Sequence, residues 1–262
     1  MQWYLGTMGF AYQQWVGVFY PEGMAQKHFL THYSGRFNSV EMDTTFYGTP
    51  RANTVLHWAE TAPDGFKFCP KMPKIITHDA GLYGEYARAL TAEFLSVMSL
   101  LNGKLGPILI QLPPMFGYEQ IDTLAAYLEE LPLTYRYAVE FRHRSWYRKE
   151  TAVLLQKHNI CWAAADYIYL PKKVVRTTDF LYLRFIGPHG QFPTKNQERI
   201  DKTEDLHRWK RQAQPHFEEI HAIYGYFNND YAGYSPATCN RFKAIVGQEP
   251  ADIRVYQQGK LF

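Results

Sequence analysis

Short apolar runs alternate with longer stretches of helical periodicity along the whole chain. Eight runs predict β-strands, at residues 2–6, 38–44, 65–70, 106–112, 136–141, 160–166, 180–185 and 222–228. Between them, segments such as 91–98 and 120–128 carry apolar residues three to four positions apart, as amphipathic helices do. Eight strand–helix units over 262 residues favour an α/β fold, a single (β/α)8 TIM-like barrel.

An open, doubly wound sheet is the alternative fold. It is less favoured because no Gly-x-Gly-x-x-Gly follows the first strand and no Gly-Lys-Ser/Thr loop is present. Pro and Gly are scattered between the apolar runs, without an internal repeat or a long linker. We therefore expect one domain over residues 1–262.

Polar residues alternate with apolar ones inside the strands, and in a barrel the polar partner should face the axis. Val40 and Met42, for example, alternate with Glu41 and Asp43. Barrel enzymes place their chemistry at the C-terminal ends of the strands. The inward set expected from this pattern is Glu41, Asp43, Lys67, Cys69, Lys71, Gln111, Glu140, Arg142, Asp166, Arg184 and Asn228.

These inward charges have two interpretations. They could form a closed structural layer of salt bridges, or they could line a substrate site. Because the set is mixed in type and adjoins aromatic and Gly-Pro loops, we favour the site. We expect Glu41, Lys71, Gln111, Glu140, Arg142, Arg184 and Asn228 to converge in one pocket walled by Tyr47 and Trp146.

Three further residues have alternative roles. His78, in a loop, is either a general acid or base or a capping or surface residue. Trp146 is either a stacking wall or a packing residue beneath its loop. Cys69 is better interpreted as a small core residue than as a nucleophile, because no adjacent His or helix start activates it.

Composition excludes several classes of protein. Hydrophobic residues make up 46% of the chain, which suits a folded core, and no apolar stretch is long enough to span a membrane. Three widely spaced cysteines suggest neither disulfides nor a zinc site, and the N-terminus lacks an export signal, so we expect a cytoplasmic protein. Twenty Tyr, 17 Phe and 6 Trp exceed the needs of the core and indicate an aromatic-lined cleft.

No motif for an organic cofactor, a tightly held zinc ion or an acyl-transfer serine is found. Glu41 and Asp43 form a weak candidate site for a hard divalent cation. Otherwise we expect no cofactor, and the sequence leaves the oligomeric state open.

Several segments, taken in order, resemble the YecE-like family of uncharacterised proteins, also called domain of unknown function 72. They are residues 19–21, 37–47, 66–68, 109–114, 138–143, 182–184 and 226–230. The resemblance implies a single (β/α) barrel but no reaction, substrate or catalytic residues. Asp43 stands where the family usually has Asn, which adds a carboxylate.

The leading hypothesis is an enzyme, such as a hydrolase, lyase or isomerase, acting on a small polar substrate that is anionic, phosphorylated or a sugar. Glu41 and Glu140 would supply acid and base, with Asp166 and His78 as further catalytic candidates. The substrate-binding candidates are Asp43, Tyr47, Lys71, Gln111, Arg142, Trp146, Arg184 and Asn228.

The alternative hypothesis is a nucleic-acid-binding module or phosphodiesterase. Arg142, Arg144, Arg148 and Lys149 lie beside Trp146 and Tyr147, and Lys172, Lys173 and Arg176 follow the sixth strand. A solvated charged face explains the same residues more simply, and the net charge of +3 is small. Nucleic acid is therefore not the favoured partner.

Overall fold

The computed structural model describes residues 1–255 and shows a mixed α/β fold with parallel sheets. Its strands are β1 (Gln2–Thr7), β2 (Ser39–Met42), β3 (Lys67–Pro70), β4 (Ile108–Gln111), β5 (Tyr137–Glu140), β6 (Cys161–Trp162), β7 (Ala164–Asp166), β8 (Phe180–Phe185) and β9 (Ala222–Phe227). Its α-helices are α1 (Phe29–Ser34), α2 (Ala52–Thr61), α3 (Gly84–Met98), α4 (Ile121–Glu130), α5 (Lys149–Lys157), α6 (Thr203–Ala213), α7 (Asn229–Ala232) and α8 (Ser235–Ile245).

All eight predicted strand regions contain strands, and the two periodic segments lie in α3 and α4. The run at 160–166 differs, because Ala163 interrupts it and divides it into β6 and β7. The expected single domain extends into residues 256–262, which lie outside the described residues.

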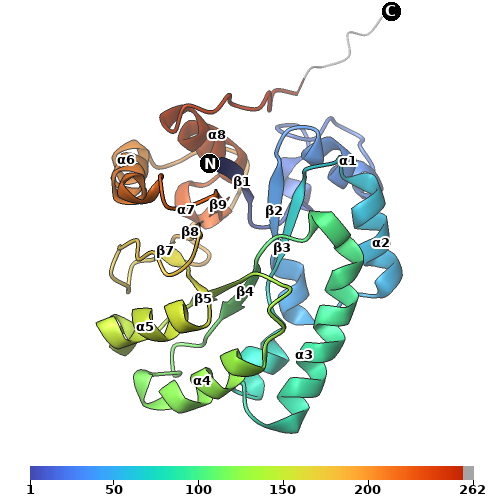
Figure 1. Ribbon diagram of the computed structural model, residues 1–262. Helices are drawn as coiled ribbons and strands as arrows, with labels where there is room; N and C mark the ends of the chain where they lie inside the picture. Colours follow the sequence, from blue (N-terminus) through green and yellow to red (C-terminus); the bar gives the residue numbers. More distant parts are fainter. Residues whose placement is uncertain (256–262) are drawn as a thin grey trace, which may run out of the picture.

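The strands pair in three parallel sheets, with the orders β1-β9-β8-β7, β2-β3 and β4-β5-β6. The expected barrel would be one continuous, closed sheet, whereas the strands within residues 1–255 pair as three separate sheets. Helices lie around the outside of the strands, as the ribbon shows (Figure 1). In residues 1–255, no helix has both the length and the apolar composition needed to cross a membrane.

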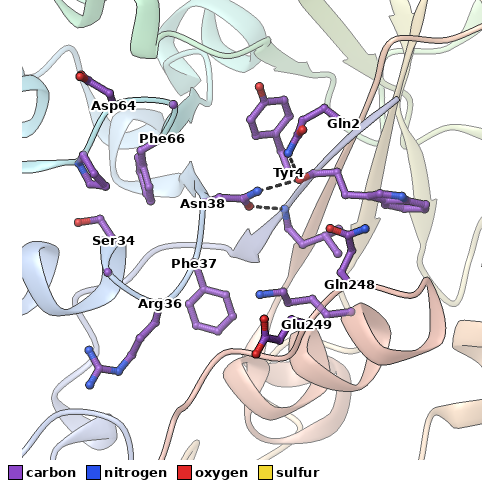
Figure 2. A pocket seen from close by; sticks show the side chains of 16 residues that line it. Gln2, Tyr4, Ser34, Arg36, Phe37, Asn38, Asp64, Phe66, Gln248 and Glu249 are labelled. Carbon is purple, nitrogen blue, oxygen red and sulfur yellow. Dashed lines mark hydrogen bonds between the residues drawn. The ribbon is translucent and has the colours of Figure 1, made fainter.

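Strands β1 and β2 belong to different sheets but approach closely. An isolated bridge joins Met8 to Glu41, and the amide of Gly9 donates to the carbonyl of Glu41 at 2.7 Å. A Cβ on Gly6 would lie 1.9 Å from the carbonyl oxygen of Ser39, so this position requires glycine. The side chain of Asn38 completes the contact, because it accepts from Leu5 N at 3.0 Å and donates to the Trp3 carbonyl at 2.7 Å (Figure 2).

Strands β3 and β4 also approach across a sheet boundary. Isolated bridges pair Phe68 with Leu105 and Lys71 with Leu109. The amide of Met72 donates to the carbonyl of Leu109 at 2.8 Å, just beyond the end of β3. These contacts place the C-terminal ends of β3 and β4 side by side.

The apolar core divides into two clusters by strand parity. The larger cluster contains the strand residues that pack against helices, among them Val40, Val139 and Leu183. The smaller one contains their neighbours on the other strand face, namely Met8, Cys69, Leu109, Ala138, Cys161, Ala163, Phe180, Tyr182, Ala222, Tyr224 and Tyr226. This division confirms the period-two pattern and directs Glu41, Glu140 and Arg184 to the same side as the smaller cluster.

Candidate functional site

A cavity of about 740 Å³ opens where several strands reach their C-terminal ends. Its lining includes seven of the eight predicted substrate-binding residues, namely Asp43, Tyr47, Lys71, Gln111, Arg142, Arg184 and Asn228. They come from the ends of β2, β3, β4, β5, β8 and β9 or from the residues directly after them. The sequence pattern therefore locates the cavity correctly.

Glu41 and Glu140 do not line this cavity, although both are fully buried beside it. Arg184 joins them. Its Nε and Nη2 donate to Glu41 at 2.9 and 2.6 Å, and its Nη1 donates to Oε2 of Glu140. The guanidinium therefore covers both carboxylates on the cavity side, which accounts for their absence from the lining.

The two carboxylates have different environments. Burial raises the pKa of Glu41, and Arg184 and a 2.8 Å hydrogen bond from the Tyr182 hydroxyl act against this. Burial also acts to raise the pKa of Glu140, but Arg142 and Arg184 outweigh it and hold that pKa below its usual value. Each glutamate accepts several donated hydrogen bonds, which suits a carboxylate that only accepts.

Lys71 is a buried cation of the site that has no ionic partner among the described residues. Its side chain is 8% exposed and its Nζ lies 3.7 Å from the centre of the Phe46 ring. Within residues 1–255, that Nζ makes no ion pair and donates no hydrogen bond. Burial lowers the pKa of Lys71 to about 8, and the Asp43 carboxylate is the strongest influence against that shift.

Thr45 fixes the backbone of Lys71. Its hydroxyl donates to the Lys71 carbonyl at 2.6 Å and accepts from the Lys71 amide at 3.0 Å. Thr45 lies in the short 3-10 helix η3 (Asp43–Tyr47), which also carries Asp43 and Phe46. Asp43 and Phe46, which line the cavity, therefore lie on one turn that Thr45 fastens to the end of β3.

Two aspartates supply acceptors at the cavity. Oδ1 of Asp43 is buried without a hydrogen-bond donor and lies 3.7 Å from Nη2 of Arg184. Asp230 accepts from the Gly190 amide at 3.0 Å, and its Oδ1 lies 3.4 Å from Nζ of Lys195. Sequence reasoning did not select Asp230, although its place directly after the strand ending in Phe227 was a usable signal.

Aromatic residues form much of the remaining wall, and most were missed by the sequence analysis. Besides the predicted Tyr47, which is 87% exposed, they are Phe10, Tyr12, Phe46 and Trp58. Their positions in loops and in α2 follow no strand periodicity, so the period-two argument could not find them.

Trp146 is not a wall of the cavity, contrary to our expectation. It is completely buried, stacks on Phe141 at 4.6 Å between ring centres and donates from Nε1 to the Phe116 carbonyl at 2.7 Å. The short helix Arg144–Trp146 turns the indole under the loop after β5. Of the two roles considered for Trp146, the structure therefore supports the packing residue beneath its loop.

Asp166 faces away from the cavity, so its expected inward orientation is wrong. It accepts hydrogen bonds from Trp209 Nε1 at 2.7 Å and the Tyr231 hydroxyl at 2.8 Å, and it pairs with Lys172 at 2.6 Å. Trp209 belongs to α6, on the helix side of the strand. The inward positions of this strand region include Cys161 and Ala163, so Asp166 has the opposite parity.

His78 lies behind the cavity lining rather than on it. Its ring contacts Phe46 edge-on at 5.1 Å, and its Nδ1 lies 2.8 Å from the Thr77 hydroxyl. Burial, followed by the charges of Lys71 and Lys74, lowers the pKa of His78 to about 4. The imidazole is therefore neutral at about pH 7.

A family model described as "Protein of unknown function DUF72" matches residues 4–260. The chain belongs to the DUF72 family. This confirms the resemblance found in the sequence, because the YecE-like proteins are the family concerned.

Curated relatives of this DUF72 protein carry no assigned activity in their names. UPF0759 protein YecE of Escherichia coli K12 is 36% identical over 146 residues, which are 56% of this chain and 50% of that protein. The alignment thus spans about half the length of that relative. UPF0759 protein YunF of Bacillus subtilis is 25% identical over 245 residues, covering 82% of this chain and 85% of that protein.

Solved DUF72 structures share the fold. A DUF72 family protein (TM1631) from Thermotoga maritima is 26% identical with a TM-score of 0.77, over 95% of this chain and all of that one. A DUF72 family protein (EF0366) from Enterococcus faecalis is 22% identical with a TM-score of 0.69, over 84% and 94% of the two chains.

Several of the basic residues considered for nucleic-acid binding in this DUF72 protein have intramolecular partners. Arg144 donates to the Tyr169 carbonyl at 2.8 Å, and Arg148 lies 3.9 Å from the centre of the Tyr118 ring. Lys172 pairs with Asp166, and Arg176 pairs with Glu219. Because Trp146 is buried as well, this face offers no indole for base stacking.

Proposed function

We propose that this DUF72 protein is an enzyme whose cavity binds a small polar anion, such as a phosphorylated sugar. The observation that carries the proposal is the buried ammonium of Lys71, which faces the cavity without an anionic partner. A buried charge without a partner is costly, and an anionic ligand would supply that partner. Arg142 and Arg184 line the same cavity and add guanidinium donors suited to phosphate or carboxylate.

The rest of the lining suits a ligand that also carries hydroxyl groups. Oδ1 of Asp43 is a buried acceptor without a donor, and Gln111 and Asn228 present amides. Phe46 and Trp58 offer apolar surface of the kind that packs against a carbon skeleton. A molecule with an anionic end and a polyhydroxyl body would satisfy all three kinds of group.

Glu41 and Glu140 then act through Arg184 instead of touching the substrate. Both hold its guanidinium, and Glu140 also holds Nε of Arg142. Both arginines line the cavity, and because these pairs already fix their side chains, a contact with a ligand would cost little further side-chain entropy. The same guanidinium also lies between Glu41 and Asp43, where a divalent cation was a weak candidate.

We also propose that the three sheets are parts of one (β/α)8 barrel. The bridges from β1 to β2 and from β3 to β4 support this, as does the direct continuation of β6 into β7. A closed barrel would place all these strand ends around one opening, as barrel enzymes do. A cytoplasmic location stays a prediction.

The test of the binding proposal is calorimetric titration with glycerol 3-phosphate, which has an anionic phosphate and two hydroxyl groups. Lys71→Met keeps an unbranched side chain, one heavy atom shorter, and removes its charge, so affinity should fall about tenfold or more, the effect of one charge-assisted contact. Lys74→Met is the matched control, because Lys74 is exposed, pairs with Asp79 and does not line the cavity. Equal affinity of both variants and the parent protein would contradict the proposal, as would no binding by the parent.

A further inference from the structure

The lysines whose contacts the structure gives differ sharply from Lys71. Lys67 donates to the Gly103 carbonyl, Lys104 to two carbonyls at 2.6 Å, and Lys210 to the Ile245 carbonyl at 2.7 Å. Others form ion pairs, such as Lys172 with Asp166 and Lys195 with Asp230. Lys71 alone among these combines burial, an aromatic ring beneath the nitrogen and direct access to a cavity of about 740 Å³.

An amine in this position is suited to nucleophilic attack. A desolvated lysine, or one next to another cation, loses its proton more readily, and the free amine is the nucleophile. Burial lowers the pKa of Lys71 to about 8, and Arg184 adds to that effect. In a fraction of the molecules the Lys71 amine is therefore unprotonated near neutral pH.

We propose that Lys71 forms a Schiff base with the aldehyde or ketone carbonyl of an anionic substrate in this cavity. This rests on the proposed function: the ammonium form of Lys71 shares the anionic end with Arg142 and Arg184, and when Lys71 has lost its proton the two arginines keep that end while the amine reaches the carbonyl. The amine nitrogen attacks the carbonyl carbon and a C–N bond forms. Both protons of the neutral amine then pass to the carbonyl oxygen, the C–O bond breaks and water leaves as the C=N bond forms, so no oxidant or reductant is needed.

Asp43 is the group placed to move the protons. It lines the same cavity, its buried Oδ1 has no hydrogen-bond donor, and its charge is the carboxylate charge that acts most strongly on Lys71. The charges of Glu41 and Glu140 also act on Lys71, but both carboxylates are paired with the Arg184 guanidinium. His78 is uncharged near neutral pH and contacts the Phe46 ring edge-on without lining the cavity.

The test is reductive trapping followed by mass spectrometry of tryptic peptides. The protein is incubated with glyoxylate, pyruvate, dihydroxyacetone phosphate or ribose 5-phosphate and then treated with borohydride, which converts an imine to a stable secondary amine. With at least one of these carbonyl compounds we expect about one adduct per chain, on Lys71, formed at least about tenfold faster than on any exposed lysine. Lys71→Arg should lose this adduct, and Lys74→Arg should retain it.

Labelling of Lys71 no faster than that of the exposed Lys74 with all four compounds would overturn the inference. A parallel titration with the alcohol counterparts lactate and glycerol 3-phosphate separates the two proposals, because these anions have no reactive carbonyl. If the alcohols bind and no adduct forms, the anion site stands and the Schiff base is wrong. If neither class binds, both proposals are wrong.

Discussion

Nη2 of Arg184 lies 2.6 Å from Oε1 of Glu41, although 143 residues separate them in the chain. Glu41 belongs to β2 and Arg184 to β8, which lie in different sheets. Both side chains are almost completely buried. The pair therefore ties distant parts of the fold together directly beneath the cavity.

Glu41→Gln should destabilise the protein strongly. The substitution leaves the buried guanidinium of Arg184 facing an amide, and breaking a buried pair in this way costs about 3–5 kcal/mol. Chemical denaturation gives the change in free energy of unfolding. The control is Glu130→Gln, which removes a half-exposed pair with Arg88 and should cost less than about 1 kcal/mol. Similar losses for both variants would show that the buried pair is not a strong constraint.

Glu140 should make stability depend on pH in the acid range. Its folded pKa lies below the ordinary value of 4.5, so its contribution is present above about pH 4.5 and is lost as the pH falls through the folded pKa. The raised pKa of Glu41 gives a dependence of opposite sign, so the comparison must isolate Glu140. Urea unfolding at several pH values should show a smaller loss of stability below about pH 4.5 in Glu140→Gln than in the parent. Parallel curves would contradict the assignment.

The sequence predicted the strand face of Glu41, Glu140 and Arg184, but it could not predict how deeply each side chain is buried. Glu41 and Asp43 share a face, two residues apart, and only Asp43 reaches the cavity because Arg184 covers Glu41. That covering residue comes from β8, so no local pattern around Glu41 contains it. The alternative interpretation, a structural layer of salt bridges, included these contacts of Arg184 with Glu41 and Glu140, whereas the acid and base roles of the two glutamates stay a prediction.

The predicted positions of the Asp166 and Trp146 side chains were wrong for reasons that lie in their local sequence. A residue at the end of a strand region was assumed to face inward, yet Asp166 follows Ala165 and points to Trp209 and Tyr231. Trp146 lies in a loop, where strand alternation no longer applies, and a short helix buries its ring. The period-two argument holds within strands and ends with them.

Trp146→Phe should separate packing from binding. The indole fills a buried space and its Nε1 bonds to the Phe116 carbonyl, so the smaller ring should lower the free energy of unfolding by about 1–3 kcal/mol. Affinity for glycerol 3-phosphate should change less than about twofold, because the ring does not line the cavity. A large loss of affinity with unchanged stability would return Trp146 to the binding site.

The folded protein should disfavour protonation of the His78 ring, and its stability should therefore depend on pH. The folded pKa of His78 is about 4 against an ordinary value of 6.5, so its contribution to stability is present above 6.5 and is lost as the pH falls toward 4. Nuclear magnetic resonance of the imidazole carbon signals should show a neutral ring at about pH 5.5. A midpoint near 6.5 in the parent would contradict the buried environment.

The measurement that tests the central claim most directly is a crystal structure of the protein soaked with glycerol 3-phosphate. Our account predicts the phosphate within hydrogen-bond distance of Lys71 Nζ and of at least one guanidinium, from Arg142 or Arg184. A second cavity, of about 580 Å³, is lined by Arg36 and by Asn38, whose side chain is hydrogen-bonded to β1 (Figure 2). Lys243 also lines this cavity. Phosphate bound there, with the Lys71 cavity empty, would contradict the account.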